Sequence, residues 1–520
     1  MKPQSKDELQ SGVCLRPSSQ AEWLGLLAIT ALGALLRCYH LGTQSLWFDE
    51  AASVAHSQGT FSQLLHSLTT GEGSPPLYFL LLHLVLRVGH SEIAVRAMSV
   101  VFGLLSIPLL YFFARALFGP ATGLIAALLM AVSPFALYYS QEARPYALLM
   151  ALSIASCYTL LLAVKRPGSA RWPAYGAVTL AALYTHYFAA FLVVAQGIVL
   201  ISAATERGKA RRGWALSLLV ITLAYLPWAP YIFAQARWQV PSAGRSWIPQ
   251  VGVLFVPYTF FQFSLGYSAA EIKQLSDLLA QAPLLLIGTV SFGFPFAAAA
   301  LKFRTQPAGV RWGLLLVLAP IAVALLVNTQ IHCYQPAYLA GVMPVFLAVV
   351  AYGIVLLRER PLWLIAPLLM VPLLGLSLKN YYSNPAFAKE DWRSVAAYLE
   401  RQAAPQDIIV FHKSWPRLAF DYYYRGSAAE YNLPDRALSP DSPHLVRAKE
   451  ELSRHSAVWL VLAHNFDTKY YYRRMLSSWF RPAERAAFVT CRPIIVARFV
   501  PRTPAQVANG AQASYTGAER

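Results

Sequence analysis

Two adjacent carboxylates, Asp49 and Glu50, follow a long apolar run near the start of this chain. The run extends from Trp23 to Tyr39, which is about the length that crosses a bilayer, ~20 residues. The chain is poor in acids, with 25 Asp and Glu against 43 Lys and Arg. Adjacent carboxylates repel each other, and a low-dielectric setting raises the pKa of at least one of them. The pair therefore suits a general base, a metal ligand or a group that orients an acceptor hydroxyl.

The same pair also has a plainer, structural interpretation. Asp is a favoured N-cap residue, so Asp49 would cap a helix that begins at Glu50. A motif of two residues does not separate these interpretations. The rest of the chain has to decide between them.

Three further segments place polar or aromatic side chains at the ends of apolar runs. Such groups mark functional sites by default, because polar side chains are costly within a membrane. A long loop, 235–279, adds a further arginine to these candidates. The segments are Gly73–Tyr78, Ser140–Tyr146 and Tyr184–Tyr187, and the candidates are Tyr78, Glu142, Arg144, Tyr146, His186 and, in the loop, Arg245.

Each of these candidates allows a structural and a functional interpretation. Glu142 and Arg144 either form a salt bridge on a short turn, or Glu142 lies near Asp49 while Arg144 binds a phosphate, whose oxygens suit a guanidinium. His186 is either a hydrogen-bonded packing residue or part of a binding site. The tyrosines either belong to the aromatic belt at the membrane surface or stack on sugar rings.

The composition indicates a polytopic membrane protein. Of 520 residues, 57% are hydrophobic and only 13% are charged, whereas about a quarter of residues are charged in soluble proteins. The net charge of +18 does not imply nucleic acid, since basic residues gather on the cytoplasmic loops of membrane proteins. We find no nucleic-acid-binding module in the sequence.

Apolar runs of near-spanning length predict about eleven transmembrane helices. Two shorter apolar stretches, 75–89 and 251–265, are interpreted as juxtamembrane or re-entrant helices, although either one could cross. The eleven runs are 22–41, 93–115, 121–139, 147–164, 173–187, 188–204, 214–234, 280–301, 312–328, 336–357 and 361–379.

Basic residues indicate which side of the membrane each loop faces. With the N-terminus in the cytoplasm, the loops near 206–212 and 302–311 are cytoplasmic and rich in Lys and Arg, as the positive-inside rule requires. An odd number of spans then leaves the C-terminal part outside. The predicted parts are a cytoplasmic tail (1–21), a membrane domain (22–379) with outer loops 42–92 and 235–279, an extracytoplasmic domain (380–503) and a disordered tail (504–520).

The part of the chain after the last apolar run is soluble in composition. It alternates helical and strand patterns, which predicts a small α/β domain. It holds no Gly-rich phosphate loop. Strands are expected at 407–412, 457–463 and 493–500, and helices at 390–401, 415–424 and 468–480.

Taken in order, the motifs resemble a known family. They are Leu-Trp-Phe-Asp-Glu at 46–50, Ser-Pro-Pro-Leu-Tyr-Phe at 74–79, Tyr-Ser-Gln-Glu-Ala-Arg-Pro-Tyr at 139–146 and Leu-Tyr-Thr-His-Tyr-Phe at 183–188. This set is similar to the bacterial branch of the GT-C glycosyltransferases, relatives of the protein O-mannosyltransferases and of the enzyme that adds aminoarabinose to lipid A. The motifs cover about 45 to 190, and the span pattern extends the resemblance to about 380.

The resemblance implies an activity and roles for the candidate residues. The family transfers a sugar from a polyprenyl-phosphate donor to an acceptor hydroxyl of a lipid, glycan or protein on the outer face of the cell (inner) membrane. Asp49 would deprotonate the acceptor, Glu50 would assist, and Glu142 would be a second acid. Arg144 and Arg245 would bind the donor phosphate. Tyr78, Tyr146 and His186 would contact substrate.

Two positions depart from the family pattern. Relatives often have His or Lys where this chain has Ser74, so a basic contact to the phosphate is lost there. Relatives also often have Arg-Tyr where this chain has Ala337-Tyr338. Basic groups elsewhere, such as Arg245, His332 or Arg393, would have to compensate.

The expected chemistry needs a base for the nucleophile and cations for the developing phosphate charge. In-line attack with one base implies inversion at the anomeric carbon. No cofactor is certain, and a divalent metal that bridges the acids and the phosphate stays open. The alternatives are a transporter or flippase of lipid-linked sugars, a non-catalytic scaffold, and an oligosaccharide polymerase or ligase.

Overall fold

The structure is a computed structural model of the chain. It describes residues 19–502 with short gaps, which include the position of Arg245 and part of its loop. The predicted N-terminal tail, up to residue 18, and the predicted disordered tail also lie outside the described residues. The gaps are 73, 166–169, 203–206, 239–250, 254, 271–274, 304–306, 360–362, 435–437, 440–441, 464–470 and 491.

The chain forms two compact units. The membrane unit comprises Met1–Leu41 and His56–Ser383, and the C-terminal unit comprises Gly42–Ala55 and Asn384–Arg520. The segment 42–55, which carries Asp49 and Glu50, therefore packs with the C-terminal domain, although the sequence places it in a loop of the membrane domain. This assignment decides which residues surround the two carboxylates.

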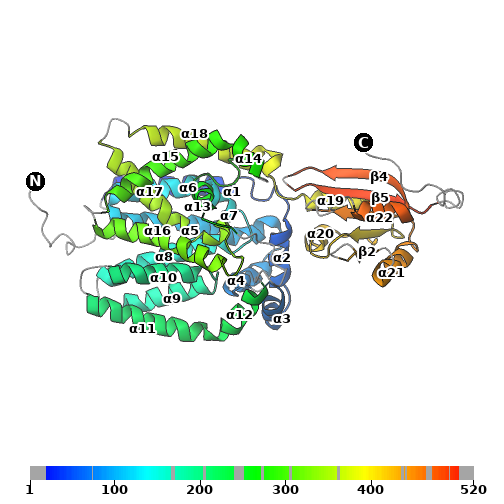
Figure 1. The fold of residues 1–520 in the computed structure, drawn as a ribbon, viewed down its shortest axis with the longest axis horizontal. Helices are drawn as coiled ribbons and strands as arrows, with labels where there is room; N and C mark the ends of the chain where they lie inside the picture. Colours follow the sequence, from blue (N-terminus) through cyan, green and yellow to red (C-terminus); the bar gives the residue numbers. More distant parts are fainter. Residues whose placement is uncertain are drawn as a thin grey trace, which may run out of the picture. The chain divides into compact units, whose positions relative to one another are not determined.

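Helices form nearly all of the membrane unit, and its long helices lie side by side (Figure 1). Each of the eleven predicted apolar runs contains helical residues. The helices are α1 (Gln20–Cys38), α3 (Phe61–Ser67), α4 (Leu77–Leu86), α5 (Glu92–Phe118), α6 (Pro120–Val132), α7 (Pro134–Ser140), α8 (Tyr146–Lys165), α9 (Arg171–Leu183), α10 (Ala189–Ser202), α11 (Arg207–Tyr225), α12 (Ala229–Trp238), α13 (Phe255–Leu265), α14 (Leu275–Ala280), α15 (Ala282–Leu301), α16 (Pro307–Asn328), α17 (Met343–Leu357) and α18 (Ile365–Ser383).

Fewer helices than eleven meet a strict length and hydropathy criterion for a span. Six stretches of the described chain are long and apolar enough, and the bent pair α6–α7 would be a seventh. The predicted number of spans is thus not established. The leftover helices α4 and α13 have 10 and 11 residues, about 15–17 Å at ~1.5 Å per residue. Each is too short to cross a core of ~30 Å by itself.

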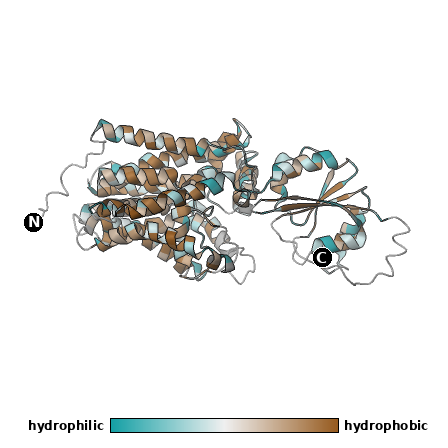
Figure 2. Cartoon of the chain, turned by 90° about the horizontal axis from the view of Figure 1, so that it is seen from above, coloured by the Kyte–Doolittle hydropathy of each residue, from teal (hydrophilic) through white to brown (hydrophobic). Residues whose placement is uncertain are grey.

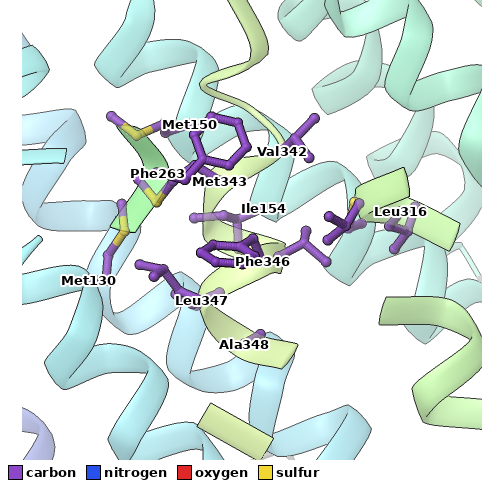
Figure 3. Close-up of a cluster of buried hydrophobic side chains, with 14 of the residues drawn as sticks. Met130, Met150, Ile154, Phe263, Leu316, Val342, Met343, Phe346, Leu347 and Ala348 are labelled. Atoms are coloured by element: carbon purple, nitrogen blue, oxygen red, sulfur yellow. The ribbon is translucent and has the colours of Figure 1, made fainter. Parts of the chain in front are cut away.

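The core of the membrane unit lies around α17. Its side chains Met343, Phe346 and Leu347 pack against apolar residues from several other helices, including Met130 and Ile154 (Figure 3). All of these side chains are almost fully buried. These buried contacts hold the helices of the unit together. Exposed leucines and valines lie on its surface, as is typical of lipid-facing helices.

A close approach between α15 and α17 depends on one glycine. A Cβ added at Gly353 would overlap the carbonyl oxygen of Pro295. Small residues let helix backbones approach closely in membranes, where packing rather than hydrophobicity drives association. Gly353 therefore fixes how these two helices cross.

The C-terminal unit contains one five-stranded sheet with the order β2-β1-β3-β5-β4. β1 runs parallel to β2 and β3, and β5 runs antiparallel to β3 and β4. Three of its strands, β1, β3 and β5, consist largely of apolar residues, and hydrophobic residues are frequent in the sheet in Figure 2. The elements are α2 (Phe48–Ser57), whose last two residues belong to the membrane unit, α19 (Trp392–Gln402), β1 (Ile408–Phe411), α20 (Arg417–Tyr423), β2 (Ala429–Asn432), α21 (Pro443–Leu452), β3 (Val458–Leu462), α22 (Tyr471–Trp479), β4 (Arg481–Phe488) and β5 (Ile494–Val500).

Alternation along the central strand explains why both faces of the sheet are covered. Successive side chains of a strand point to opposite faces. Ile409 and Phe411 of β1 pack with Trp392 of α19, whereas Ile408 and Val410 pack with residues of α21 and α22. The α/β prediction for this part of the chain is confirmed.

Candidate functional site

A broken helix, α6–α7, leads directly to the predicted site residues of the membrane unit. The two helices meet at a bend of 57°. Pro134 has no N–H, so the carbonyl oxygen of Met130 has no helical partner. Arg37, which is fully buried, donates from Nη2 to Met130 O (3.0 Å), from Nη1 to Ala131 O (2.9 Å) and from Nε to Ser140 Oγ (3.1 Å). One guanidinium thus stabilises the break and the end of α7.

Gln141 extends this network just after α7. Its side-chain amide donates to the carbonyl oxygens of Arg37 (2.8 Å) and Tyr39 (2.7 Å). Its side-chain oxygen accepts a hydrogen bond from Tyr381 Oη (2.7 Å). The C-terminal end of α1, the end of α7 and α18 are therefore joined at the position where the candidate acid and arginine begin.

Glu142 and Arg144 lie on the tight turn that connects α7 and α8. The backbone N–H of Arg144 donates to the carbonyl oxygen of Glu142 (2.9 Å). Glu142 is 1% exposed. The turn therefore holds a buried carboxylate and a guanidinium two residues apart.

Aromatic rings from four segments gather beside this turn. Tyr146 at the start of α8 contacts Tyr139 (ring centroids 4.7 Å apart), His186 (5.9 Å) and Tyr338 (6.4 Å). His186 and Tyr338 lie 5.1 Å apart, and Phe188 contacts Tyr338 at 5.3 Å. We call these five residues the aromatic cluster. Tyr338 belongs to it although it was not predicted as a site residue; the sequence draws attention only to its neighbour Ala337, which departs from the family pattern.

His186 lies in the turn between α9 and α10, outside both helices. Burial, and then the positive charge of Arg144, lower the pKa of His186 to about 3. Its Nδ1 accepts a hydrogen bond from the backbone N–H of Phe188 (3.2 Å). The ring is therefore neutral with its proton on Nε2, which makes it a hydrogen-bond donor and a poor general base.

The short helix α4 carries Tyr78, which is 1% exposed. The backbone N–H of Leu77 donates to the carbonyl oxygen of Tyr184 (2.9 Å). This bond ties the start of α4 to the turn that bears His186. The structure thus brings the motifs around Tyr78, Glu142 and His186 into one neighbourhood.

Asp49 and Glu50 lie in the first turn of α2, which begins at Phe48. Asp49 is therefore inside the helix and does not cap a helix that starts at Glu50. Carboxylates are favoured in a first turn, where the helix dipole is positive. Asp49 is half-buried, whereas Glu50 is fully buried and pairs with Lys389 at 3.1 Å.

Side chains of the C-terminal unit also contact the two residues that precede this pair of acids. Phe48 contacts Trp415 (ring centroids 4.5 Å apart), and the guanidinium of Arg492 lies 5.3 Å from the ring centroid of Trp47. Lys389 was not predicted as a functional residue. Its position beside Glu390, just after the last apolar run, is the signal in the sequence that could have indicated it.

No metal site emerges from the part of the chain that the structure describes: no three His, Cys, Asp or Glu side chains gather there as ligands would. The membrane unit brings together Glu142, Arg144, Tyr146 and His186. Asp49 and Glu50 belong to the other unit, and Arg245 lies outside the described residues.

The comparisons with known proteins agree with this architecture. Residues 73–231 match the model of the dolichyl-phosphate-mannose-protein mannosyltransferase family. The chain superimposes on ArnT from Cupriavidus metallidurans in the apo state with a TM-score of 0.58 and 12% identity, covering 92% of this chain and 98% of ArnT. The fold is that of the GT-C glycosyltransferases. The sequence-based prediction of that fold is confirmed.

Two further structures support the same fold. ArnT bound to undecaprenyl phosphate gives a TM-score of 0.56 with 12% identity over 92% of this chain and 98% of that chain. The apo oligosaccharyltransferase of Archaeoglobus fulgidus gives 0.55 with 12% identity over 90% of this chain and 73% of that chain. No curated protein matches the sequence significantly.

Proposed function

We propose that this protein is a multi-pass membrane glycosyltransferase that moves a sugar from a polyprenyl-phosphate donor to an acceptor hydroxyl. The observation that carries the proposal is the turn 142–144, where a buried acid and an arginine adjoin the aromatic cluster inside a GT-C fold. The matched family is named for a dolichyl-phosphate-mannose donor, and one matched ArnT structure holds undecaprenyl phosphate. Both are lipid-phosphate compounds of the proposed class.

The candidate residues divide between binding and chemistry. Arg144 binds the donor phosphate, because a guanidinium matches phosphate oxygens with two parallel hydrogen bonds. Arg245 is proposed as a second phosphate ligand on the strength of the family resemblance. The aromatic cluster and Tyr78 contact the sugar and the isoprenoid head, and the neutral His186 donates a hydrogen bond from Nε2.

The reaction itself requires one base. Asp49 accepts the proton of the acceptor hydroxyl, whose oxygen forms the new bond to the anomeric carbon. The bond from that carbon to the phosphate oxygen breaks, and the electron pair leaves with the phosphate. Arginine stabilises the charge that develops there. Attack opposite the leaving group inverts the anomeric carbon.

The proposed location is the cell inner membrane, with the N-terminus in the cytoplasm and the C-terminal unit outside. The basic loops support this orientation, since Lys and Arg prefer the cytoplasmic side. A lipid-linked donor keeps its chain in the bilayer and its head group at the surface. The acceptor, a lipid, glycan or protein, would therefore meet the sugar at the outer face.

The test is sugar transfer from a panel of radiolabelled polyprenyl-phosphate sugars, with membranes that contain the wild type or Asp49→Asn. We expect transfer by the wild type from one donor and a loss of at least ~10³-fold in the variant, the upper range of acid–base contributions. Equal transfer by both would exclude Asp49 as the base. A matched Glu142→Gln variant then shows whether the second acid takes part.

A second candidate function is transfer of a larger, oligosaccharide donor. The match to the oligosaccharyltransferase of A. fulgidus favours it, although this chain covers only 73% of that protein. Pyrophosphate-linked oligosaccharides in the same panel separate the two functions. Transfer from those donors alone would replace the proposal with this one.

A further inference from the structure

The acidic segment 42–55 is built into the C-terminal unit by hydrogen bonds at several points. Ser45 Oγ donates to the carbonyl oxygen of Glu390 (2.5 Å) and accepts from the backbone N–H of Trp392 (3.1 Å). Gln44 Oε1 accepts from the backbone N–H of Lys389 (3.0 Å). The start of α19 and the residues before α2 thus form one structure.

Further contacts fix the same segment from α20 and from the hydrophobic core. The backbone N–H of Leu46 donates to Tyr423 Oη (2.7 Å). Arg393 donates to the carbonyl oxygens of Thr43 (3.2 Å) and Gly42 (3.1 Å). Ala51 is 2% exposed and packs in the core that α19 forms with the sheet.

Glu50 and Lys389 form the buried ion pair at the centre of these contacts. The two side chains are 0% and 4% exposed, and Lys389 Nζ lies 3.1 Å from Glu50 Oε2. Removing one partner of such a pair leaves an uncompensated buried charge, whereas removing both charges is often tolerated. Glu50 is adjacent to Asp49 in the same helical turn, so a shift of one moves the other.

We propose that Lys389 is a positioning residue for catalysis: its ion pair with Glu50 fastens α2 to the C-terminal unit and so sets the position of Asp49. The C-terminal unit then belongs to the catalytic machinery, because it carries the base. Glu50 acts through the pair and not on substrate. The kinetic part of this inference rests on the proposed transferase function, and the structural part does not.

A double-mutant cycle separates positioning from chemistry. Lys389→Met and Glu50→Gln each leave one buried charge without its counterion, and we expect each to lower kcat/KM about 10²-fold, the cost of a misplacement of about 1 Å. The double variant Glu50→Gln/Lys389→Met has neither charge, and we expect it to recover at least ten-fold over Lys389→Met. Lys449→Met, at an exposed lysine of α21, is the matched control and should keep wild-type rates.

Hydrogen–deuterium exchange of the full-length protein tests the same idea without any donor. In Lys389→Met we expect amides of 48–55 to exchange at least ten-fold faster, and in the double variant we expect their protection to return. Unchanged protection in a folded Lys389→Met would overturn the proposal, whatever the enzyme transfers. A double variant as inactive as the singles, with protection restored, would also overturn it, because Glu50 would then act in the chemistry.

The two failures are distinguishable. If the wild type transfers no sugar, the proposed function fails while the exchange data still decide whether Lys389 holds α2. If the wild type transfers sugar and exchange is unaffected by Lys389→Met, the positioning role fails alone.

Discussion

At the scale of single residues, His186 combines a low pKa with a defined tautomer, and this combination limits its role. A ring that stays neutral above pH 3 cannot supply a titration near neutrality. Gln can replace the Nε2 donor, whereas Phe cannot. We therefore expect the transfer rate of His186→Gln to stay within about ten-fold of the wild-type rate. The transfer rate of His186→Phe should fall about 10²-fold, which is typical of removing one hydrogen-bond donor to a developing charge. The pH–rate profile of His186→Gln should match that of the wild type, and a lost limb in it would show that His186 acts as a base.

Arg144 is the residue to which we assign the donor phosphate, and it also influences His186. Replacing it with Lys keeps the charge but not the planar fork, so we expect a partial defect, with the KM for donor raised about ten-fold. Arg144→Gln should raise it further and should raise the pKa of His186, because the repulsive charge is gone. Burial remains, so that pKa should stay below its ordinary value. Steady-state kinetics with varied donor and NMR titration of His186 measure the two effects, and a donor KM unchanged in Arg144→Gln would remove the phosphate role.

At the scale of elements, the break between α6 and α7 depends on Arg37. Arg37→Met leaves the carbonyls of Met130 and Ala131 buried without this donor, at a cost of about 1–3 kcal/mol for each group. We expect a clearly lower thermal midpoint and faster amide exchange over 130–146, with Arg37→Lys intermediate. Arg358→Met, at an exposed arginine after α17, is the control and should match the wild type in both measurements. Wild-type exchange in Arg37→Met would show that Pro134 alone maintains the bend.

The elements that the sequence predicts are those with strong apolar signals. Strands β1, β3 and β5 are buried and rich in Ile and Val, and all three were predicted. β4 was missed because it is an exposed edge strand with Arg481, Glu484 and Arg485. Such charges interrupt the apolar alternation by which a strand is recognised in a sequence, and they also protect a sheet edge from aggregation. β2 was missed because its four residues carry no apolar run.

The site was predictable only in part, for a related reason. Polar residues that interrupt apolar runs, such as Glu142 and His186, are conspicuous in the sequence. Lys389 carries only the weak signal of its charged neighbour Glu390, because its partner Glu50 lies far earlier in the chain and only the fold brings the two together. The assignment of 42–55 to the C-terminal unit was missed because the local sequence of a loop does not indicate which unit the loop packs against.

At the scale of the whole molecule, two units with separate cores should respond differently to pH. In the C-terminal unit, Arg417 lies 2.8 Å from Glu430 and 3.3 Å from Asp421. Burial, and then the negative charge of Asp421, raise the pKa of Glu430 to about 7, and the nearby Arg417 offsets only part of this rise. The carboxyl group of Glu430 thus binds its proton more tightly in the folded unit than in the unfolded chain.

Because the pKa of Glu430 is higher in the folded state, its contribution is present below the unfolded pKa of about 4.5 and is lost as pH rises through about 7. We expect the C-terminal unit to lose on the order of 1 kcal/mol from this group between pH 5 and 8, after allowance for solvent screening. Glu430→Gln mimics the protonated side chain and should flatten that part of the profile. Hydrogen exchange of β1 and β2 against pH measures it within the intact protein, and Glu450→Gln, at an exposed position of α21, is the control. An unchanged slope in Glu430→Gln would mean that Arg417 keeps Glu430 charged, so the stability of this unit would have to depend on other groups.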